Sequence, residues 1–289
     1  MSIFEGAATA LVTPFTETGI DFKGLQELID FQLENEIDAL VISGTTGEPA
    51  TMTESEKAEV IRLAIRHVNG RVPVIVGTGA NSTASAVKWS KFAEDEGADA
   101  LLLVTPYYNK CSQDGLVRHY FTVADSVHIP MVLYNVPSRT GVNVTPATLA
   151  RLAEHPNIAA MKEASANISQ ITEMVRLCGD KLDFYSGNDD HIIPIMSLGG
   201  KGVISVLSNV VPQYTHELCA AYLAGDTRRA LQMQLDINPL VSALFSDVNP
   251  IPVKTALNLM GKPAGPLRLP LCEMSPEKTA ALTAVLEDY

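Results

Sequence analysis

The strongest constraint on the fold is a regular alternation of short apolar runs with longer segments of helical period. Each pair of segments takes up about 25 to 30 residues, which is the rhythm of a parallel α/β protein. The apolar runs lack the polar alternation of a half-buried strand, so we expect both faces of the sheet to be covered. The predicted strands are 8–12, 39–42, 74–76, 100–104, 131–134, 158–161, 184–185 and 202–206.

The segments between these runs carry apolar residues at helical spacing. In segment 53–67, Thr53 and Glu56 form a capping-box pattern at the expected helix start. The same period recurs in 82–96, 115–126, 147–154 and 167–177. Eight such units without the glycine fingerprint of an open dinucleotide-binding sheet predict an α/β fold of the closed kind, a (β/α)8 TIM barrel.

After residue 211 the strand signals stop and the pattern is helical. The predicted helices are 214–224, 227–245, 252–260 and 276–287. We therefore expect a catalytic barrel over residues 1–224 and a C-terminal helical region over 225–289, which could pack on the barrel or make subunit contacts.

The charge composition of the chain argues against some classes of binding partner. The chain has 21 Lys and Arg residues against 33 Asp and Glu residues, a net charge of −12, and no cationic cluster. This argues against nucleic-acid and membrane partners. There is no signal-peptide pattern and no apolar run long enough to span a membrane, so we expect a soluble, cytoplasmic protein. The four cysteines and six histidines show no metal-ligand spacing, and we expect reduced thiols and no metal.

Polar residues gather after the predicted strands, at the end where barrels of this kind carry their active sites. Lys162 directly follows the apolar run 158–161, which would place its ammonium group in the barrel mouth. Desolvation lowers the pKa of a lysine, and the neutral amine can attack a ketone to form a Schiff base. The alternative is a structural lysine paired to Glu163 or to another carboxylate.

Hydroxyl groups follow other strands at the same end. Tyr134 could exchange a proton near the lysine if its phenol is coupled to the hydroxyls of Thr46 and Tyr108. Thr45 and Thr46 lie between glycines in a turn that suits a carboxylate, although such a sequence also occurs as a plain turn. Tyr108 and its neighbour Tyr107 could equally pack at a subunit contact.

Arg139 lies in a loop between Pro137 and Gly141. Its guanidinium has the geometry for bidentate capture of a carboxylate, and the alternative is an ordinary surface arginine. The residues thus predict a reactive lysine, a neighbouring phenol and two carboxylate receptors, without naming the substrates.

These motifs together resemble one family, in that family's order and over essentially the whole chain: the dihydrodipicolinate synthases. Related pyruvate-dependent aldolases that act on sugar acids share the barrel, the lysine and the tyrosine, but they usually lack an arginine in the position of Arg139. The motifs are GTTGE (44–48), TPYYNK (105–110), YNVPSRTG (134–141), MKEAS (161–165), YSGND (185–189), GVISV (202–206) and NPIPVK (249–254).

The resemblance implies a lyase that condenses pyruvate with aspartate 4-semialdehyde, the first committed step toward diaminopimelate and lysine. Lys162 would form the Schiff base, and Tyr134 would assist proton transfer through Thr46 and Tyr108. In the family, the tyrosine that matches Tyr108 reaches in from the adjacent subunit.

The resemblance also implies the binding groups. The turn of Thr45 and Thr46 would hold the pyruvate carboxylate, and Arg139 would hold the carboxylate of the aldehyde. The backbone at Gly187 and Ile204 would line the pocket. The family is a homotetramer built as a dimer of dimers, and it uses no metal or organic cofactor.

Two alternatives remain at this stage. One is another pyruvate-dependent Schiff-base aldolase that acts on a sugar acid, and the other is a noncatalytic barrel that serves as a binding protein. The second would require damaged catalytic positions, whereas all of those quoted above are intact.

The resemblance departs from lysine-inhibited members at the effector pocket. Those members carry a histidine and a glutamate where Glu54 and Ser85 stand here, alongside Asn81 and Tyr107. Ser85 offers no carboxylate for the ammonium group of lysine, and Glu54 would repel its carboxylate. We therefore expect weak or absent inhibition by lysine.

Overall fold

A computed structural model describes residues 2–289. Its eight parallel strands form one closed barrel in chain order, which confirms the predicted (β/α)8 fold. All eight predicted strands are present, with ends that differ by a few residues. The strands are β1 (Gly6–Ala10), β2 (Ala39–Ile42), β3 (Val74–Gly77), β4 (Ala100–Val104), β5 (Met131–Asn135), β6 (Ile158–Glu163), β7 (Asp183–Ser186) and β8 (Gly202–Ser205).

Helices follow the strands, and the four helices predicted after residue 211 are present, with a non-helical segment between α11 and α12. The helices are α1 (Phe22–Glu34), α2 (Glu54–Val68), α3 (Thr83–Asp95), α4 (Gln113–Ala124), α5 (Pro137–Thr140), α6 (Pro146–Leu152), α7 (Ile168–Cys178), α8 (Ile192–Ser197), α9 (Pro212–Leu223), α10 (Thr227–Leu244), α11 (Ile251–Leu259) and α12 (Pro276–Leu286). The short 3-10 turns are η1 (Thr45–Gly47), η2 (Pro49–Thr51), η3 (Asp189–His191) and η4 (Leu207–Asn209).

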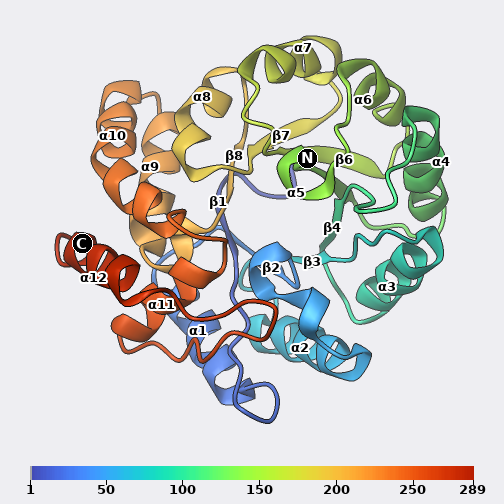
Figure 1. Ribbon diagram of the computed structural model, residues 1–289. Helices are drawn as coiled ribbons and strands as arrows, with labels where there is room; N and C mark the ends of the chain where they lie inside the picture. The colour runs from blue at the N-terminus through green and yellow to red at the C-terminus, as the bar shows by residue number, and fades with distance from the viewer. Residues whose placement is uncertain (1) are drawn as a thin grey trace. The chain divides into compact units, whose positions relative to one another are not determined.

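The described chain forms two compact units. One holds residues 2–5 and Pro73–Ile204, and the other holds Gly6–Val72 and Ser205–Tyr289. In the first unit, helices α3, α4, α6 and α7 lie on the outer side of the strands (Figure 1). The strands there are buried on both faces, which explains their unbroken apolar sequences.

The register of the first unit places functional candidates on neighbouring strands. Tyr134 on β5 is the partner of Lys162 on β6, and Lys162 is in turn the partner of Tyr185 on β7. Side chains at paired positions of parallel strands point to the same face of the sheet. The strand pairing therefore brings the phenol of Tyr134 and the amine of Lys162 to one face.

In the second unit, β1 pairs with β2, and α9 packs against β1. Helices α10, α11 and α12 pack on one another. Helix α2 begins with the predicted capping box: the Thr53 side chain accepts a hydrogen bond from the Glu56 amide, and the Glu56 carboxylate accepts one from the Thr53 amide. These reciprocal bonds satisfy two amides at the helix start.

Two predicted strands, β1 and β6, have ends that are wrong by two residues. Strand β1 is shifted toward the N-terminus relative to 8–12, because Ala7 exchanges backbone and side-chain hydrogen bonds with Asp38. Strand β6 does not end at Met161 but continues through Lys162 and Glu163, both of them buried. The prediction ended that strand at its first charged residue, and charged residues rarely continue a buried strand.

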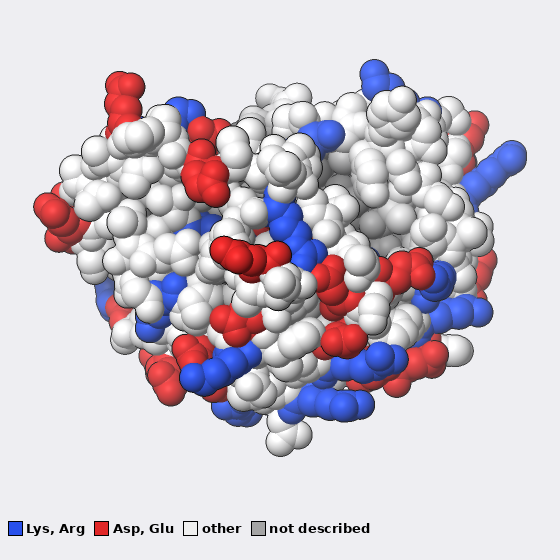
Figure 2. All heavy atoms as spheres, turned by 60° about the horizontal axis from the view of Figure 1, so that its bottom comes forward, with Lys and Arg blue, Asp and Glu red and all other residues white. Residues whose placement is uncertain are grey.

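No helix among residues 2–289 is long and apolar enough to cross a membrane. On the face drawn in Figure 2, acidic and basic side chains are interspersed, and the basic side chains gather into no broad patch among the described residues.

Candidate active site

Lys162 is 5 % exposed and lies near the C-terminal end of β6. Its Nζ atom lies over the ring of Tyr134, 4.3 Å from the ring centroid. The next residue, Glu163, belongs to the opposite face of the strand, since successive side chains of a strand alternate. The Glu163 carboxylate accepts hydrogen bonds from the Asn135 side chain and, at 2.7 Å, from the Ser165 amide. The structure therefore has no Lys162–Glu163 pair of the kind considered above.

Burial sets the acidity of this lysine. Desolvation lowers the pKa of Lys162 to about 8, the Asp189 carboxylate opposes that shift, and the positive charge of Arg139 adds to it. A lysine with this pKa has a substantial neutral fraction near neutral pH, whereas an exposed lysine has almost none. The amine of Lys162 can therefore act as a nucleophile.

Gly187 packs directly against the aliphatic part of the Lys162 side chain. A Cβ atom placed on Gly187 would lie 3.1 Å from Cε of Lys162 and 2.8 Å from Cβ of Ala164. The Gly187 amide also donates to the backbone oxygen of Glu163. Because glycine has no side chain, the segment after β7 can approach Lys162 closely. Three of the predicted site residues, Lys162, Tyr134 and Gly187, therefore lie together in the structure.

Arg139 is exposed and lies on the short helix α5. Its loop is held at both ends by buried polar contacts. The Thr105 hydroxyl donates to the Thr140 hydroxyl at 2.9 Å, and the Val144 amide donates to the Asn135 side chain at 3.0 Å. Arg139 is therefore an exposed residue on a loop that buried hydrogen bonds hold in place.

Tyr108 is placed differently from the other candidates. Its side chain is 89 % exposed, and its backbone has φ +74°, a value that non-glycine residues seldom adopt. A large aromatic ring held outward in this way packs little against its own chain. Ile204, by contrast, is fully buried on β8.

Thr45 and Thr46 form η1 in the second unit, directly after β2. Thr46 is 2 % exposed, and its hydroxyl accepts a hydrogen bond of 3.0 Å from the side-chain amide of Asn249. The Thr13 hydroxyl donates to the backbone oxygen of Gly47 at 2.8 Å. The turn is therefore fixed from β1 and from the segment that precedes α11.

A buried ion pair behind this turn was not predicted. Lys254 on α11 is 1 % exposed and donates to the Glu48 carboxylate at 2.9 Å, and also to the backbone oxygens of Thr13 and Pro266. Glu48 has φ +53° and joins η1 to η2. Arg268 adds a hydrogen bond from its amide to the same carboxylate. The sequence signal was the single charge of Lys254 in the otherwise uncharged helix 251–259.

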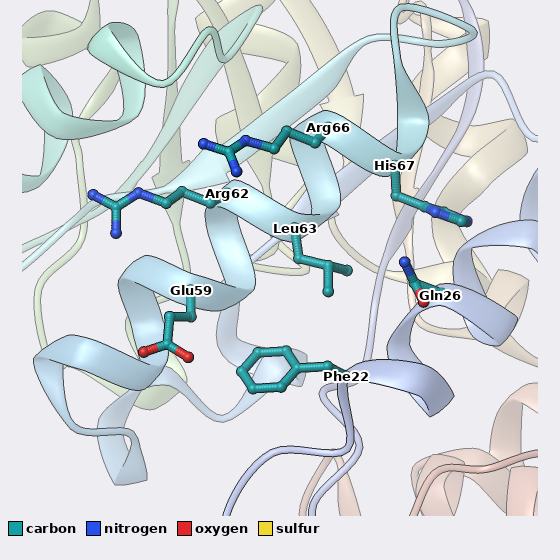
Figure 3. A pocket seen from close by; sticks show the side chains of 7 residues that line it. All are labelled: Phe22, Gln26, Glu59, Arg62, Leu63, Arg66 and His67. Atoms are coloured by element: carbon teal, nitrogen blue, oxygen red, sulfur yellow. The ribbon is translucent and has the colours of Figure 1, made fainter.

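A groove of about 500 Å³ lies between α1 and α2, where Phe22 faces Leu63 (Figure 3). None of the predicted site residues lines it. The lining residues are Phe22, Gln26, Glu59, Arg62, Leu63, Arg66 and His67.

A closed (β/α)8 barrel with a desolvated lysine over a tyrosine ring, near the C-terminal end of a strand, defines a class of enzyme that can work through a lysine nucleophile. The sequence assigns the family within that class. A family model described as the dihydrodipicolinate synthetase family matches residues 3–289, and the chain belongs to that family.

Individual relatives agree over the full length. The chain is 50 % identical over 289 residues to the 4-hydroxy-tetrahydrodipicolinate synthase of Clostridium novyi (strain NT), covering 100 % of this chain and 98 % of that protein. The crystal structure of dihydrodipicolinate synthase from Thermotoga maritima is 44 % identical, with a TM-score of 0.97 and 99 % of each chain covered. The structure of a monomeric dihydrodipicolinate synthase variant is 44 % identical, with a TM-score of 0.97, and the match covers 99 % of this chain and 97 % of that one.

Proposed function

We propose that this protein is a lyase that condenses pyruvate with L-aspartate 4-semialdehyde to give 4-hydroxy-tetrahydrodipicolinate, the first committed step toward diaminopimelate and lysine. The observation that carries the proposal is the buried amine of Lys162 over the Tyr134 ring. Membership of the family and relatives at about 50 % identity support the choice of substrates and do not favour the sugar-acid alternative.

The neutral amine of Lys162 attacks the ketone carbon of pyruvate, and loss of water leaves a Schiff base. The protonated imine withdraws electrons, so the methyl group loses a proton and becomes an enamine. The enamine carbon then attacks the aldehyde carbon of the second substrate, whose oxygen takes up a proton. Finally the amino group of that substrate attacks the imine carbon, and the ring closes as Lys162 is released as a free amine.

Each proton transfer in this reaction needs a side chain that donates or accepts the proton. We assign Tyr134 to proton exchange at the reacting centre, with a relay through the hydroxyls of Thr46 and Tyr108. The exposure of Tyr108 supports a role in which this tyrosine completes the site of an adjacent subunit. A group that shuttles protons in this way is expected to contribute about 100-fold or more to the rate.

The substrate carboxylates need cationic or amide donors. We assign the pyruvate carboxylate to the turn of Thr45 and Thr46, and the aldehyde's carboxylate to Arg139, with the backbone at Gly187 and Ile204 lining the pocket. Arg139 is accessible on a fixed loop, which supports this role. Arg139→Ala should mainly raise KM for the aldehyde.

We further propose a homotetramer built as a dimer of dimers, acting in the cytoplasm. Residues 1–224 would form the catalytic barrel, and 225–289 would support it. The exposed Tyr107 and Tyr108 support a subunit contact on this side of the first unit. The four cysteines are dispersed along the sequence without CxxC pairs, which supports a reducing compartment.

The test is borohydride reduction in the presence of pyruvate, followed by intact-protein mass spectrometry and by a condensation assay on the same preparation. The wild-type protein should gain one pyruvyl adduct on Lys162 and should condense the two substrates. Lys162→Arg should lose both, because a guanidinium stays protonated. Lys201→Arg is the matched control: this lysine is paired with Glu5 and should keep both activities.

The outcomes separate the candidate functions. An adduct without condensation would favour a sugar-acid aldolase, which would then cleave a sugar acid in the same preparation. An absent adduct, or an adduct retained in Lys162→Arg, would refute the lysine as nucleophile.

A further inference from the structure

Asn135 ends β5, directly before the segment 136–143 that carries α5 and Arg139, and it is fully buried. Its side-chain oxygen accepts a hydrogen bond of 3.0 Å from the Val144 amide, just beyond the other end of that segment. The Asn135 side chain therefore closes the base of the Arg139 loop. Because a backbone amide can only donate, this bond also identifies the oxygen of the side-chain amide, and its nitrogen lies on the other side.

The side-chain nitrogen of Asn135 donates to both oxygens of the Glu163 carboxylate, at 3.1 and 3.3 Å. The two residues are partners in the register of β5 and β6, one position after the partners Tyr134 and Lys162. Because successive side chains of a strand alternate, the two pairs lie on opposite faces of the sheet. The same two strands thus carry the reactive amine on one face and the anchor of the Arg139 loop on the other.

Glu163 is 1 % exposed, so its carboxylate depends on donors within the protein. Burial raises the pKa of Glu163, and hydrogen bonds from Ser165, Asn135 and the Ala164 amide oppose that shift. An ionised carboxylate only accepts hydrogen bonds, so it holds the Asn135 amide by its nitrogen. A neutral amide in its place would turn a donor toward one of these donors.

Asn143, at the far end of the loop, is held by the same network and by two helices. Its side-chain oxygen accepts from the Asn135 nitrogen at 2.9 Å, and its side chain exchanges hydrogen bonds of 2.7 and 3.1 Å with Gln170 on α7. Gln113, at the start of α4, donates to the Asn143 backbone oxygen at 2.8 Å. Polar networks of this kind fix a single side-chain arrangement when their members are satisfied.

We propose that Glu163 and Asn135 are positioning residues that hold Arg139 where it receives the carboxylate of the second substrate. The proposal rests on the proposed function, because it requires that Arg139 bind the carboxylate of the aldehyde. The residue next to the nucleophile would thus act on the second substrate through the loop, and not on Schiff-base formation.

The experiment measures KM for each substrate, the rate of pyruvate trapping and thermal unfolding in a set of variants. Asn135→Ala opens the base of the loop and should raise KM for the aldehyde about tenfold, an effect expected when a binding group is misplaced slightly. The rate of pyruvate trapping and its pH profile should stay nearly unchanged, because burial has the largest effect on the pKa of Lys162. A purely structural role would change trapping and KM together.

A double-mutant cycle with Arg139→Ala tests whether the effect passes through the arginine. Once Arg139 is truncated, Asn135→Ala should add almost nothing to KM for the aldehyde, because the group that it positions is gone. Two independent effects on KM would multiply instead.

An exchange of the two side-chain types provides a rescue. Glu163→Gln alone should reproduce the tenfold rise in KM, because its amide nitrogen meets a donor. Combined with Asn135→Asp, the carboxylate and the amide trade places, and the new carboxylate can still accept from the Val144 amide. KM for the aldehyde should then return to within about threefold of the wild-type value, as expected for a restored hydrogen bond.

Asn157→Ala is the matched control. This asparagine lies just before the other end of β6, and its side chain donates to the backbone oxygens of Ala124 and Val127. Its truncation should lower the unfolding midpoint and leave both KM values unchanged, because Asn157 makes no contact with the Arg139 loop.

The possible failures are distinguishable. If Arg139→Ala kept the wild-type KM for the aldehyde, the carboxylate assignment of the proposed function would be wrong, and this inference would fail with it. If Arg139→Ala raised KM but Asn135→Ala did not, or if the two increases multiplied, Arg139 would keep its role and the role of Asn135 and Glu163 would be overturned.

A loss of pyruvate trapping in proportion to the loss of condensation would also overturn the positioning role, because the network would then support this end of the barrel as a whole. If Asn135→Ala did not fold, the exchanged pair would decide. A stable exchanged pair that kept a raised KM for the aldehyde would refute the proposal.

Discussion

Lys162 owes its proposed chemistry mainly to burial. Asp189 and Arg139 act on its pKa in opposite directions, so the loss of solvent is the dominant influence on the amine. The side chain lies on one face of β6, while Glu163 is held on the other by Asn135 and the Ser165 amide. A one-residue shift of the strand would exchange the two residues.

The pKa of Lys162 predicts the pH dependence of trapping. Only the neutral amine attacks pyruvate, and with a pKa of about 8 its fraction rises about tenfold per pH unit below 8 and levels off above it. The initial rate of adduct formation, measured by quenched borohydride reduction from pH 6 to 9.5, should follow this curve. A rate that still climbed steadily at pH 9.5 would show an unperturbed lysine.

Gly187→Ala tests the packing beside Lys162. The new methyl group would collide with Cε of Lys162 and with Ala164, and would displace the amine. We expect kcat to fall by about tenfold to 100-fold, which is the usual effect of a small misplacement of a reacting group. Gly19→Ala is the control, since nothing lies within 4 Å of the added atom. Wild-type kcat in Gly187→Ala would contradict the described contact.

At the scale of elements, α11 holds the turn that follows β2. The Lys254 ammonium meets Glu48 and two backbone oxygens, and both Lys254 and Arg268 lie over the Phe15 ring. Desolvation lowers the pKa of Lys254, and the Glu48 carboxylate counteracts this shift. The conformation of the turn at η1 therefore depends on tertiary contacts as well as on the glycines at its two ends.

Lys254→Met should destabilise the protein strongly, because it leaves the Glu48 charge buried without its partner. Loss of one member of a buried pair costs about 3 to 5 kcal/mol of unfolding free energy. Lys278→Met removes the exposed pair with Asp247 and should cost less than about 1 kcal/mol. Urea denaturation of both variants measures the difference, and equal midpoints would show that the buried pair contributes little.

The sequence predicts this fold well where local pattern decides it. Apolar runs marked all eight strands, and the Thr53–Glu56 pattern marked the start of α2. Lys162 and Tyr134 were predicted as neighbours because they end adjacent strands. Asn249 and Lys254 could not be assigned partners, because their contacts join positions more than 200 residues apart and no local pattern records them.

At the scale of the whole molecule, the position of Tyr108 bears on assembly. A ring that is 89 % exposed does not complete a buried site in its own chain. In a symmetric dimer each subunit would lend this tyrosine to the other, so the functional unit would be the pair.

Mixing two inactive variants tests this exchange. In a mixed dimer of Tyr108→Phe and Lys162→Arg subunits, one site would combine an intact Lys162 with an intact Tyr108, so random exchange should restore about a quarter of wild-type activity. Condensation is assayed after the subunits are dissociated and reassociated together. Each variant treated alone is the control, and a mixture as inactive as its components would place Tyr108 in its own subunit's site.

Inhibition by lysine is a property that the proposed assembly would carry. Because Ser85 offers no carboxylate for the ammonium group of lysine and Glu54 would repel its carboxylate, we expect condensation to continue at nearly full rate in millimolar lysine. Initial rates at fixed substrate over a lysine titration check this, and strong inhibition below one millimolar would show that the effector is held by other groups.

The contacts of Asn249, Lys254 and Arg268 with residues 46 and 48 also impose an order in time. A ribosome makes the threonine turn and Thr13 early, yet the three C-terminal residues that also hold the turn emerge only after four fifths of the chain has been synthesised. A nascent chain stopped before residue 249 would carry Lys162, Tyr134 and Arg139 with a turn that lacks its C-terminal contacts. Prematurely terminated products should therefore be inert, and would not release partially condensed intermediates into the cell.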